Sequence, residues 1–370
     1  MNFDFSEEQK ELRDHARRFL KDQCPWTVVR SVLEGAAPYS ETLWRGVAEN
    51  GWMATALPEA YGGIGLGYVD LCVIAEELGR VTAPIPFSST VYLAAEALLL
   101  SGDEANQSEY LSKIAGGETI GTFAAIEGAG TFSMDNIQTQ FASNRLTGTK
   151  IAVPDGDVAS FAVVLAQSSR GPSWVLVDLT KGGITREAVK TVDPARSHAK
   201  IIFDGAQAEP LGEPGKGWEL TQRLFDRAAV LFAFEQLGGA TSAMEMARNY
   251  AIERYAFGRA IGSFQAIKHR LADMFVKIEL ARSNCYYAAW ALSKNAPELP
   301  LAAASARVAA SDAYHFASKE NIQVHGGMGF TWEADCQFHY RRARLLGLNL
   351  GGAPAWKERL VTALEAGAVA

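Results

Sequence analysis

The sequence predicts an α+β fold with three parts: an N-terminal α-helical domain, a small middle β domain and a C-terminal four-helix bundle. Apolar residues first recur at spacings of three and four over residues 1–117, as on one face of a helix. Short segments rich in β-branched and aromatic residues follow over 118–210, each bounded by Gly, Asn, Asp or Ser. Long apolar patterns of helical period resume over 211–370. These changes of pattern give the predicted domain boundaries.

The N-terminal part begins with a helix, because Ser6 and Gln9 form a capping box ahead of an apolar stripe. Further helical patterns cover 41–50, 68–78 and 91–100. The glycine-rich stretch Gly62-Gly63-Ile-Gly65 neither follows a strand nor carries the Lys-Ser/Thr of a phosphate-binding loop. We therefore interpret it as a turn.

The middle and C-terminal parts differ in period. Strand-like segments occur at 119–126, 137–141, 161–165, 174–177 and 201–203. Helical patterns then cover 218–253, 264–294, 301–324 and a final segment at 341–364. The last four account for the predicted bundle.

The composition limits the function. Of the 370 residues, 48% are hydrophobic and 21% charged, as in ordinary globular proteins, and the formal net charge of −7 offers nucleic acid no bulk attraction. The chain has no signal-peptide pattern and no run of about 18 apolar residues, so we expect no membrane span and a cytoplasmic location. No C-x-x-C pair occurs, so we expect no metal site and reduced core cysteines at Cys24, Cys72, Cys285 and Cys336.

One junction interrupts the long helical pattern of the C-terminal part. The stretch Arg254-Tyr-Ala-Phe-Gly258-Arg-Ala-Ile-Gly-Ser-Phe-Gln265 predicts two long helices that meet at Phe257-Gly258. An arginine there can hold an anion, because guanidinium offers forked donors to phosphate and the second helix begins with free N–H groups. A plain helical hairpin with a surface arginine is the alternative, and the spacing by itself leaves both open.

Three segments resemble the acyl-CoA dehydrogenase family of flavoproteins. The stretch from Arg254 resembles the family's R-x-x-F-G-x-x-[ILV]-x-x-x-Q segment, and Gln323-Val-His-Gly326-Gly327-Met-Gly329-Phe330 resembles its Q-x-x-G-G-x-G-[FY] segment. Near the start, Leu57-Pro-Glu-Ala-Tyr61-Gly62-Gly63-Ile-Gly65 and Glu76-Glu77-Leu78-Gly79-Arg80 resemble P-E-x-[YF]-G-G-x-G and E-E-L-G-R. The matches follow the family's order over nearly the whole chain.

The resemblance implies FAD as cofactor. In the family the flavin lies between the β domain and the C-terminal bundle, with its pyrophosphate and adenine reaching a second subunit. Arginine neutralises a diphosphate bidentately, and paired glycines allow a backbone approach that a Cβ would block. The cofactor-binding residues implied are Arg254, Phe257, Phe264, Gln265, Gln323, His325, Gly326 and Gly327.

The catalytic base is where the sequence departs from the family. These enzymes remove an α proton from an acyl thioester while hydride leaves the β carbon for the flavin, so a carboxylate base is needed. Counted from Gly329-Phe330, the commonest base position falls at Leu350, and the alternative position on the earlier long helix falls at Ala228. Neither residue can take a proton.

Glu235 is the acid that stands out near those positions. It lies in the apolar run Leu231-Phe-Ala-Phe-Glu235-Gln-Leu, seven residues on from Ala228 and therefore about 10 Å along the helix axis. Burying a carboxylate among apolar residues is costly without a partner. A catalytic role and a core carboxylate paired with an arginine or a helix terminus are equally open.

Further departures concern the flavin and the CoA. The family's T-E-P-x-x-G-S-D segment is shortened to Ile126-Glu127-Gly-Ala-Gly-Thr131-Phe-Ser. Pro154 stands where relatives have the Thr of W-I-T-N, and it has no N–H to donate to the ring. The CoA-facing arginine expected at Ala229 is absent, although Arg227 is nearby.

The resemblance implies an acyl-CoA dehydrogenase subunit with an acyl-CoA substrate, electron-transfer flavoprotein or a similar acceptor, and a homo- or heterotetrameric assembly. Because both base positions are vacant, we expect a paralogous partner to supply the base, as in heterotetrameric members that act on bulky steroid-side-chain thioesters. A homo-oligomeric enzyme that uses Glu235, and a non-catalytic scaffold that binds FAD or CoA, are the alternatives.

Overall fold

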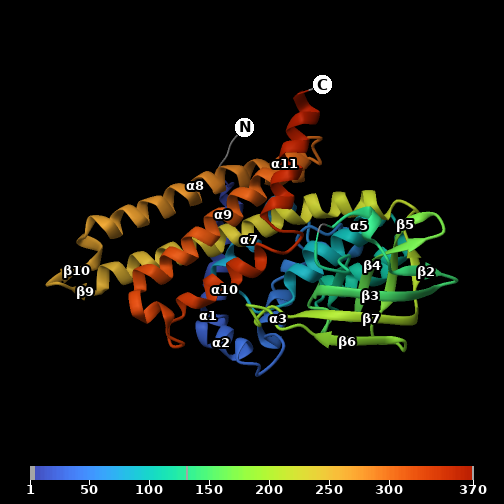
Figure 1. Ribbon diagram of the computed structural model, residues 1–370, viewed down its shortest axis with the longest axis horizontal. Helices are drawn as coiled ribbons and strands as arrows, with labels where there is room; N and C mark the ends of the chain where they lie inside the picture. Colours follow the sequence, from blue (N-terminus) through green and yellow to red (C-terminus); the bar gives the residue numbers. More distant parts are fainter. Residues whose placement is uncertain (1–4, 131, 369–370) are drawn as a thin grey trace. The chain divides into compact units, whose positions relative to one another are not determined.

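The computed structural model describes residues 5–130 and 132–368, drawn in Figure 1. They form two compact units, and neither is continuous in the sequence. We call residues 31–67 and 84–228 the sheet unit. Residues up to 30, residues 68–83 and residues from 229 onward form the helical unit.

The sheet unit is built on an eight-stranded mixed sheet with strand order β6-β7-β3-β2-β4-β5-β8, in which β1 pairs with β4 in parallel. Buried apolar residues fill β4 and β5, as expected of the centre of a covered sheet. The strands are β1 (Gly121–Ala124), β2 (Gln140–Ala142), β3 (Arg145–Pro154), β4 (Phe161–Ser168), β5 (Gly171–Asp178), β6 (Ile184–Ala188), β7 (His198–Gln207) and β8 (Glu209–Leu211).

Helices of the sheet unit cover part of this sheet. They are α3 (Glu41–Glu49), α5 (Glu96–Ser101) and α6 (Glu104–Ala115), with a π-helix at Ser88–Ala95 leading into α5. The predicted glycine-rich turn is confirmed: Gly62 has φ 87°, and a Cβ on Gly63 would lie 1.9 Å from the Leu57 carbonyl oxygen. Thr131, part of the shortened segment, lies outside the described residues.

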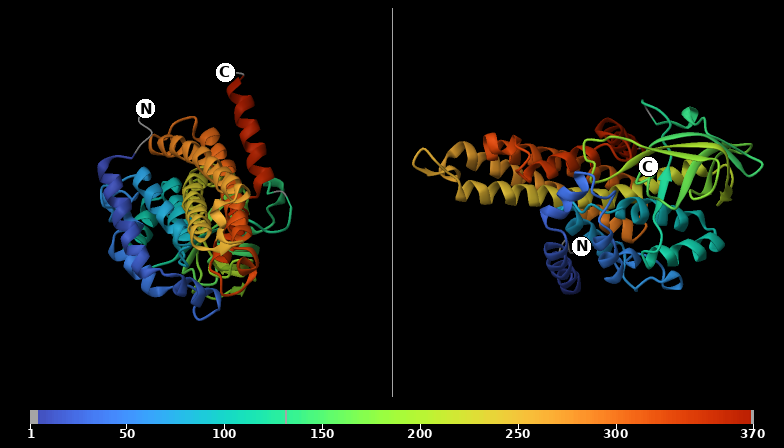
Figure 2. Two further views of the ribbon diagram at one scale, coloured as in Figure 1. Left: turned by 90° about the vertical axis from the view of Figure 1, so that its left-hand side faces the viewer. Right: turned by 90° about the horizontal axis from the view of Figure 1, so that it is seen from below.

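Long helices make up the helical unit, and α7, α8 and α9 run side by side in it (Figures 1 and 2). Its helices are α1 (Glu7–Gln23), α2 (Trp26–Leu33), α4 (Tyr68–Arg80), α7 (Gly217–Glu253), α8 (Gln265–Ser293), α9 (Leu299–His325), α10 (Cys336–Leu346) and α11 (Ala353–Ala368). Both α2 and α7 have part of their length in the sheet unit. Among the described helices, none is long and apolar enough to cross a membrane.

Three sequence predictions concern these elements: the capping box of the first helix, the final helical segment and the state of the cysteines. The capping box is confirmed, since the Ser6 hydroxyl accepts from the Gln9 N–H and the Gln9 side chain accepts from the Ser6 N–H. The final helical segment is divided into two helices: α10 ends at Leu346 and α11 begins at Ala353, because three glycines lie between them, Gly351 at φ 99°. The four cysteines are buried and free.

Two glycines let α4 and α7 cross in close contact. A Cβ on Gly79 of α4 would lie 1.9 Å from the carbonyl oxygen of Glu235, and a Cβ on Gly238 of α7 would lie 1.8 Å from that of Glu76. Real Cβ atoms cannot approach an oxygen so closely, so only glycine is accommodated at either position. The crossing fixes where Glu235 sits in the helical unit.

The three charged residues of the E-E-L-G-R segment form ion pairs around this crossing. Glu76 accepts from Arg282 of α8 at 2.8 Å, and Glu77 from Arg17 of α1 at 2.6 Å. Arg80 pairs with Glu245 of α7. The segment that resembles the family motif thus holds α1, α4, α7 and α8 together.

Candidate cofactor and substrate site

The predicted anion-binding junction lies at one end of the helical unit. A short hairpin of β9 (Tyr255–Ala256) and β10 (Arg259–Ala260) joins α7 to α8. At its tip, Phe257 and Gly258 have φ values of 54° and 79°, the two positive angles that a type I′ turn requires. The long helices are therefore joined by a β-hairpin (Figure 1), which the helical pattern did not predict.

Arg254 is the first residue after α7, and its side chain is exposed. Its carbonyl accepts from the Ile261 N–H at 2.8 Å, which fixes the base of the hairpin. Across residues 5–130 and 132–368, its guanidinium has no hydrogen-bond or ion-pair partner. Close by, the Arg259 guanidinium lies 4.1 Å from the centroid of the Phe264 ring, which Phe257 meets edge to face at 6.2 Å.

The end of α9 lies against the last turn of α7. The His325 ring stacks on Tyr250 with centroids 4.1 Å apart, and its Nδ1 lies 2.8 Å from the Asn321 carbonyl oxygen. A carbonyl only accepts, so Nδ1 carries the proton. Gly326 follows at φ 58°, and a Cβ built on Gly326 or Gly327 would meet no atom within 4 Å. The stack therefore ties the end of α7 to an open glycine backbone.

This end of the bundle fits a dinucleotide cofactor. We call it the hairpin end: the β9–β10 hairpin, the start of α8 and the end of α9. It offers an exposed guanidinium for phosphate, aromatic rings for a base and glycines that a ligand can approach closely. Gln265 begins α8 and Gln323 lies in the last turn of α9, both exposed. None of the eight residues predicted to bind FAD is buried.

Both family base positions hold apolar residues with no proton-accepting group. Ala228 is fully buried in α7. Leu350 is half-buried between α10 and α11, with a φ of 60° that is uncommon for a residue other than glycine.

Glu235 lies in the helical unit with only 2% of its surface exposed. Its carboxylate is 3.7 Å from the guanidinium of Arg342, which is 1% exposed and donates to the carbonyls of Thr82 at 3.0 Å and Ala83 at 3.2 Å. The Glu235 backbone is pressed against Gly79. Of the two interpretations of Glu235, this geometry favours a structural carboxylate paired with arginine.

In the sheet unit, a buried lysine forms an ion pair with Glu127 of the shortened segment that begins at Ile126. Lys150 of β3 is fully buried, and its Nζ donates to the Glu127 carboxylate at 2.6 Å and the Ala125 carbonyl at 3.0 Å. Glu127 also accepts from the backbone N–H groups of Gln138 at 2.7 Å and Thr139 at 3.1 Å. Burial lowers the pKa of Lys150 to about 8, an effect that Glu127 opposes. The sequence reasoning missed Lys150, although a lysine inside an alternating strand could have signalled it.

The end of β3 and the residue after it are bonded to neighbouring segments of the sheet unit. The Pro154 carbonyl accepts from the Thr122 hydroxyl at 2.6 Å. Asp155 is buried at φ 50°, and its carboxyl accepts from the Ser89 hydroxyl at 2.6 Å. Burial raises the pKa of Asp155, against the influence of Arg196. This carboxyl therefore anchors the π-helix to the sheet.

Arg227, the candidate to replace the CoA-facing arginine, is already engaged. Its Nε lies 2.7 Å from the carboxylate of Glu96, whose side chain is 3% exposed. The pair leaves Arg227 little freedom to contact another anion.

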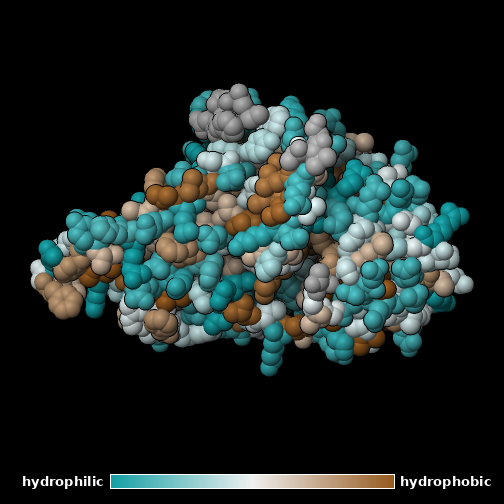
Figure 3. Space-filling view, turned by 45° about the horizontal axis from the view of Figure 1, so that its top comes forward, coloured by the Kyte–Doolittle hydropathy of each residue, from teal (hydrophilic) through white to brown (hydrophobic). Residues whose placement is uncertain are grey.

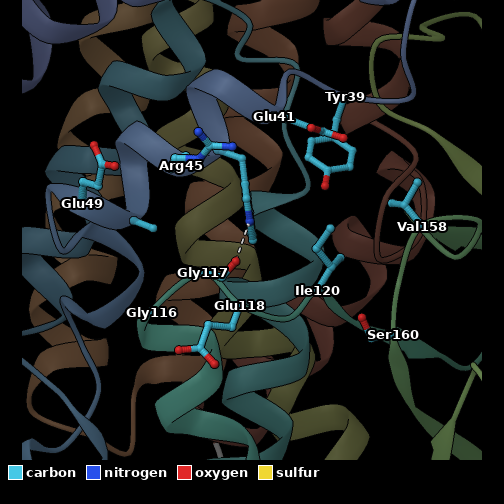
Figure 4. A pocket seen from close by; sticks show the side chains of 12 residues that line it. Tyr39, Glu41, Arg45, Glu49, Gly116, Gly117, Glu118, Ile120, Val158 and Ser160 are labelled. Carbon is cyan, nitrogen blue, oxygen red and sulfur yellow. Dashed lines mark hydrogen bonds between the residues drawn. The ribbon is translucent and has the colours of Figure 1, made fainter.

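A pocket of about 600 Å³ opens on the sheet unit, and Figure 4 shows its lining. Its charged residues are Glu41, Arg45, Glu49 and Glu118. Three carboxylates against one guanidinium repel a diphosphate. This pocket therefore does not suit the FAD or CoA phosphates, whereas the hairpin end does.

Comparisons with known proteins agree with the motif matches. Residues 6–118 match the acyl-CoA dehydrogenase N-terminal domain, and residues 215–353 match the acyl-CoA dehydrogenase C-terminal domain. Acyl-CoA dehydrogenase IpdE2 of Mycobacterium tuberculosis is 34% identical over 339 residues, which cover 91% of this chain and 91% of that protein.

Two solved structures extend the similarity over the whole fold. The Tcur3481-Tcur3483 steroid ACAD, as a G363A variant, is 32% identical with a TM-score of 0.89, covering 98% of this chain and 99% of that one. The ChsE4-ChsE5 complex of Mycobacterium tuberculosis is 26% identical with a TM-score of 0.89, covering 99% of both chains.

Proposed function

Because the chain belongs to the acyl-CoA dehydrogenase family, whose members are oxidoreductases acting on the CH–CH bond of acyl-CoA thioesters, we propose that it works as one subunit of a heteromeric dehydrogenase. A paralogous partner supplies the catalytic base. The subunit role rests on which of this chain's own acids could act as the base.

The observation that carries the proposal is that neither expected base position holds a carboxylate and that Glu235, the acid nearest to them in the apolar run of α7, is buried in an ion pair. Both family base positions are apolar, at Leu350 and Ala228. Glu235 is engaged with Arg342 in the core of the helical unit. A base must reach the substrate's α carbon, and a carboxylate fixed in a buried ion pair is held away from that task.

We propose FAD as the cofactor, as in the family. Arg254 would neutralise the pyrophosphate, and Gly326-Gly327 would receive the nucleotide by backbone contact. Phe257, Phe264, Gln265, Gln323 and His325 would surround it at the hairpin end. Bound FAD supplies the ring that accepts hydride from the substrate's β carbon. All eight residues are accessible in this chain, which supports a nucleotide shared with a second subunit.

The proposed substrate is a bulky acyl-CoA, such as a steroid-side-chain thioester. The similar Tcur3481-Tcur3483 structure is a steroid ACAD, which supports a substrate of this class. The similar ChsE4-ChsE5 structure is a complex of two different chains, which supports the heteromeric assembly. We also propose a tetrameric assembly and electron-transfer flavoprotein or a similar protein as the acceptor.

The experiment that tests the proposal is purification of the chain alone and after co-expression with a paralogue that carries Glu at a base position. We expect yellow protein that no acyl-CoA bleaches, and bleaching once the partner is present. Turnover by the isolated chain would contradict the partnered subunit. Colourless protein in both preparations would contradict flavin binding.

The homo-oligomeric alternative depends on Glu235. If Glu235 were the base, Glu235→Gln would abolish acyl-CoA-driven bleaching and lower the rate by about 10²–10⁴. The ion pair with Arg342 predicts another result: the variant loses stability by about 3–5 kcal/mol, because an uncompensated buried charge is left behind. Urea unfolding and flavin bleaching of the same preparation separate the two.

A further inference from the structure

The turn that carries Leu350 has a defined backbone. We call residues 347–352, between α10 and α11, the 347–352 turn. The Leu348 N–H donates to the Leu345 carbonyl at 3.0 Å, and the Gly351 N–H to the Leu348 carbonyl at 3.1 Å. Leu350 and Gly351 have φ values of 60° and 99°. A leucine in the left-handed region is strained, and such strain persists only where the surroundings over-determine it.

A single buried arginine supplies those surroundings. Arg307 of α9 is 1% exposed. One guanidinium nitrogen donates both to the Leu346 carbonyl, at the end of α10, and to the Asn349 carbonyl, next to Leu350, at 2.7 Å. The two carbonyls lie on either side of the 347–352 turn's first bend. Arg307 therefore clamps the turn from inside the helical unit.

The clamp is itself held in place. The other terminal nitrogen of Arg307 donates to the Gln236 side-chain oxygen at 2.5 Å, and that oxygen also accepts from the Ser311 hydroxyl at 3.2 Å. The guanidinium lies 5.7 Å from the centroid of the Phe232 ring. Burial lowers the pKa of Arg307 to about 10, so it stays charged at neutral pH. Helices α7 and α9 thus fix the orientation of the guanidinium.

A surface turn after a helix does not require this arrangement. Helices commonly end at a glycine in the left-handed conformation, and water satisfies their last carbonyls. Here a fully buried cation, costly to desolvate, serves two carbonyls of one turn. Ending α10 alone does not account for the free-energy cost of burying this cation. The arrangement therefore points to residue 350, whose position it fixes.

We propose that Arg307 is a positioning residue that fixes residue 350 in the geometry of a catalytic base, and that this chain keeps that geometry although Leu350 has no carboxylate. The inference rests on the proposed function, because it takes position 350 to face the acyl-CoA. A carboxylate introduced there takes the α proton of the thioester. The β hydride would go to bound FAD, and the products would be the α,β-unsaturated thioester, reduced FAD and the protonated carboxyl.

The first arm of the test asks whether the geometry is retained. Leu350→Glu restores a carboxylate, and Leu350→Gln is the matched uncharged control of the same size. We expect acyl-CoA to bleach the flavin of the isolated Leu350→Glu protein and not that of Leu350→Gln. The bleaching rate rises with pH as the new carboxyl ionises. Yellow Leu350→Glu protein that no acyl-CoA bleaches overturns the retained geometry.

The second arm asks whether Arg307 maintains it. Lysine keeps the charge but has a single terminal nitrogen, so it cannot bond the two carbonyls of the turn and the Gln236 side chain from the two positions that the guanidinium occupies. We expect Arg307→Lys combined with Leu350→Glu to lower the bleaching rate at least tenfold while FAD stays bound, with a smaller change in KM than in kcat. An unchanged rate in this double variant overturns the role of Arg307.

A third readout needs no flavin. Hydrogen exchange of the Leu348 and Gly351 amides should quicken at least tenfold in Arg307→Lys and remain unchanged in Arg344→Lys, an exposed arginine of α10. Unchanged exchange in Arg307→Lys overturns the clamp. Colourless Leu350→Glu protein would contradict the proposed flavoprotein function, while the exchange data still decide the clamp.

Discussion

At the scale of single residues, the protein concentrates its unusual side chains in two environments. Buried charges such as Lys150, Arg307 and Arg342 each satisfy backbone carbonyls as well as side chains. Arg254 is the opposite case, an exposed arginine without a partner among the described residues. A buried ion bonded to several fixed groups stabilises one conformation, whereas an exposed cation without a partner among the described residues can bind a ligand.

The first residue-scale prediction concerns Arg254. Arg254→Ala should lower FAD occupancy, because a lost charge-assisted contact costs about 1.5–3 kcal/mol, or roughly 10–100-fold in affinity. The measurement is the ratio of flavin to protein absorbance after gel filtration. Arg248→Ala, an exposed arginine of α7, is the control that should keep its flavin. Full retention by Arg254→Ala would remove this residue from the cofactor site.

The second residue-scale prediction is that Lys150 makes the stability of the protein depend on pH. Its pKa is about 8 in the folded protein and near 10.5 in the unfolded chain. Between these values the unfolded chain holds a proton that the folded protein has released, so this group raises the free energy of unfolding as pH rises from 8 to 10.5. Below pH 8 Lys150 is protonated in both the folded protein and the unfolded chain, so the full free-energy cost of burying its charge lowers the stability.

Urea unfolding at several pH values checks this linkage. The stability of the native protein relative to Lys150→Met should increase between pH 8 and pH 10 and stay level between pH 6 and pH 7. A difference that is flat across the whole range would mean that Lys150 does not release its proton in the folded state.

At the scale of elements, the contact between α4 and α7 decides the interior of the helical unit. Gly79 and Gly238 remove the side chains that would keep the helices apart. The pairs of Glu76 with Arg282 and Glu77 with Arg17 then join α8 and α1 to the same crossing. A motif of five residues thereby positions four helices.

Gly79→Ala tests this crossing against helix propensity. Alanine favours a helix over glycine by about 1 kcal/mol, so propensity alone predicts stabilisation. The new Cβ would lie 1.9 Å from the Glu235 carbonyl oxygen, so we expect a net loss of about 1–3 kcal/mol or more. Chemical denaturation measures it. Gly367→Ala in α11, where a Cβ meets nothing within 4 Å, should be neutral or slightly stabilising. A more stable Gly79→Ala protein would contradict the close crossing.

At the scale of the whole molecule, the helical unit leaves apolar surface uncovered. Figure 3 shows hydrophobic side chains among hydrophilic ones over the long helices. Phe275, Val276 and Leu280 of α8 are 54%, 54% and 62% exposed, and Val361 and Leu364 of α11 are also exposed. Figure 2 shows α11 extending away from the bundle. Apolar helix faces of this kind are usually covered by a partner.

We therefore predict that α8 contributes to an oligomer interface. Leu280→Glu should shift the particle to a smaller mass, because a charge would be buried among apolar side chains. Light scattering at micromolar concentration measures the mass. Ser283→Glu, also exposed on α8, is the control for added charge. Native protein that is already monomeric would refute the interface.

The domain boundaries 1–117, 118–210 and 211–370 remain our proposal for the polypeptide.

The sequence determined what depends on local pattern. Apolar spacing placed the long helices close to their observed bounds, and the Ser6 side chain is within reach of the Gln9 N–H in any helix that starts there. The resemblance carried by three segments identified the family. The same resemblance predicts that the base positions fall at Leu350 and Ala228, whose side chains have no group that can take a proton.

Only the tertiary structure decided which distant side chains meet. The sequence left Glu235 open as a base or a core carboxylate, and the contact with Arg342, far along the chain, favours the core carboxylate. The bond of Lys150 to Glu127 and those of Arg307 to the 347–352 turn likewise join segments that no periodicity relates. Even the β9–β10 hairpin depended on positive φ angles at Phe257 and Gly258. The physical reason is that helix periodicity is fixed by neighbours three and four residues away, whereas ion pairing and burial are fixed by how whole elements pack.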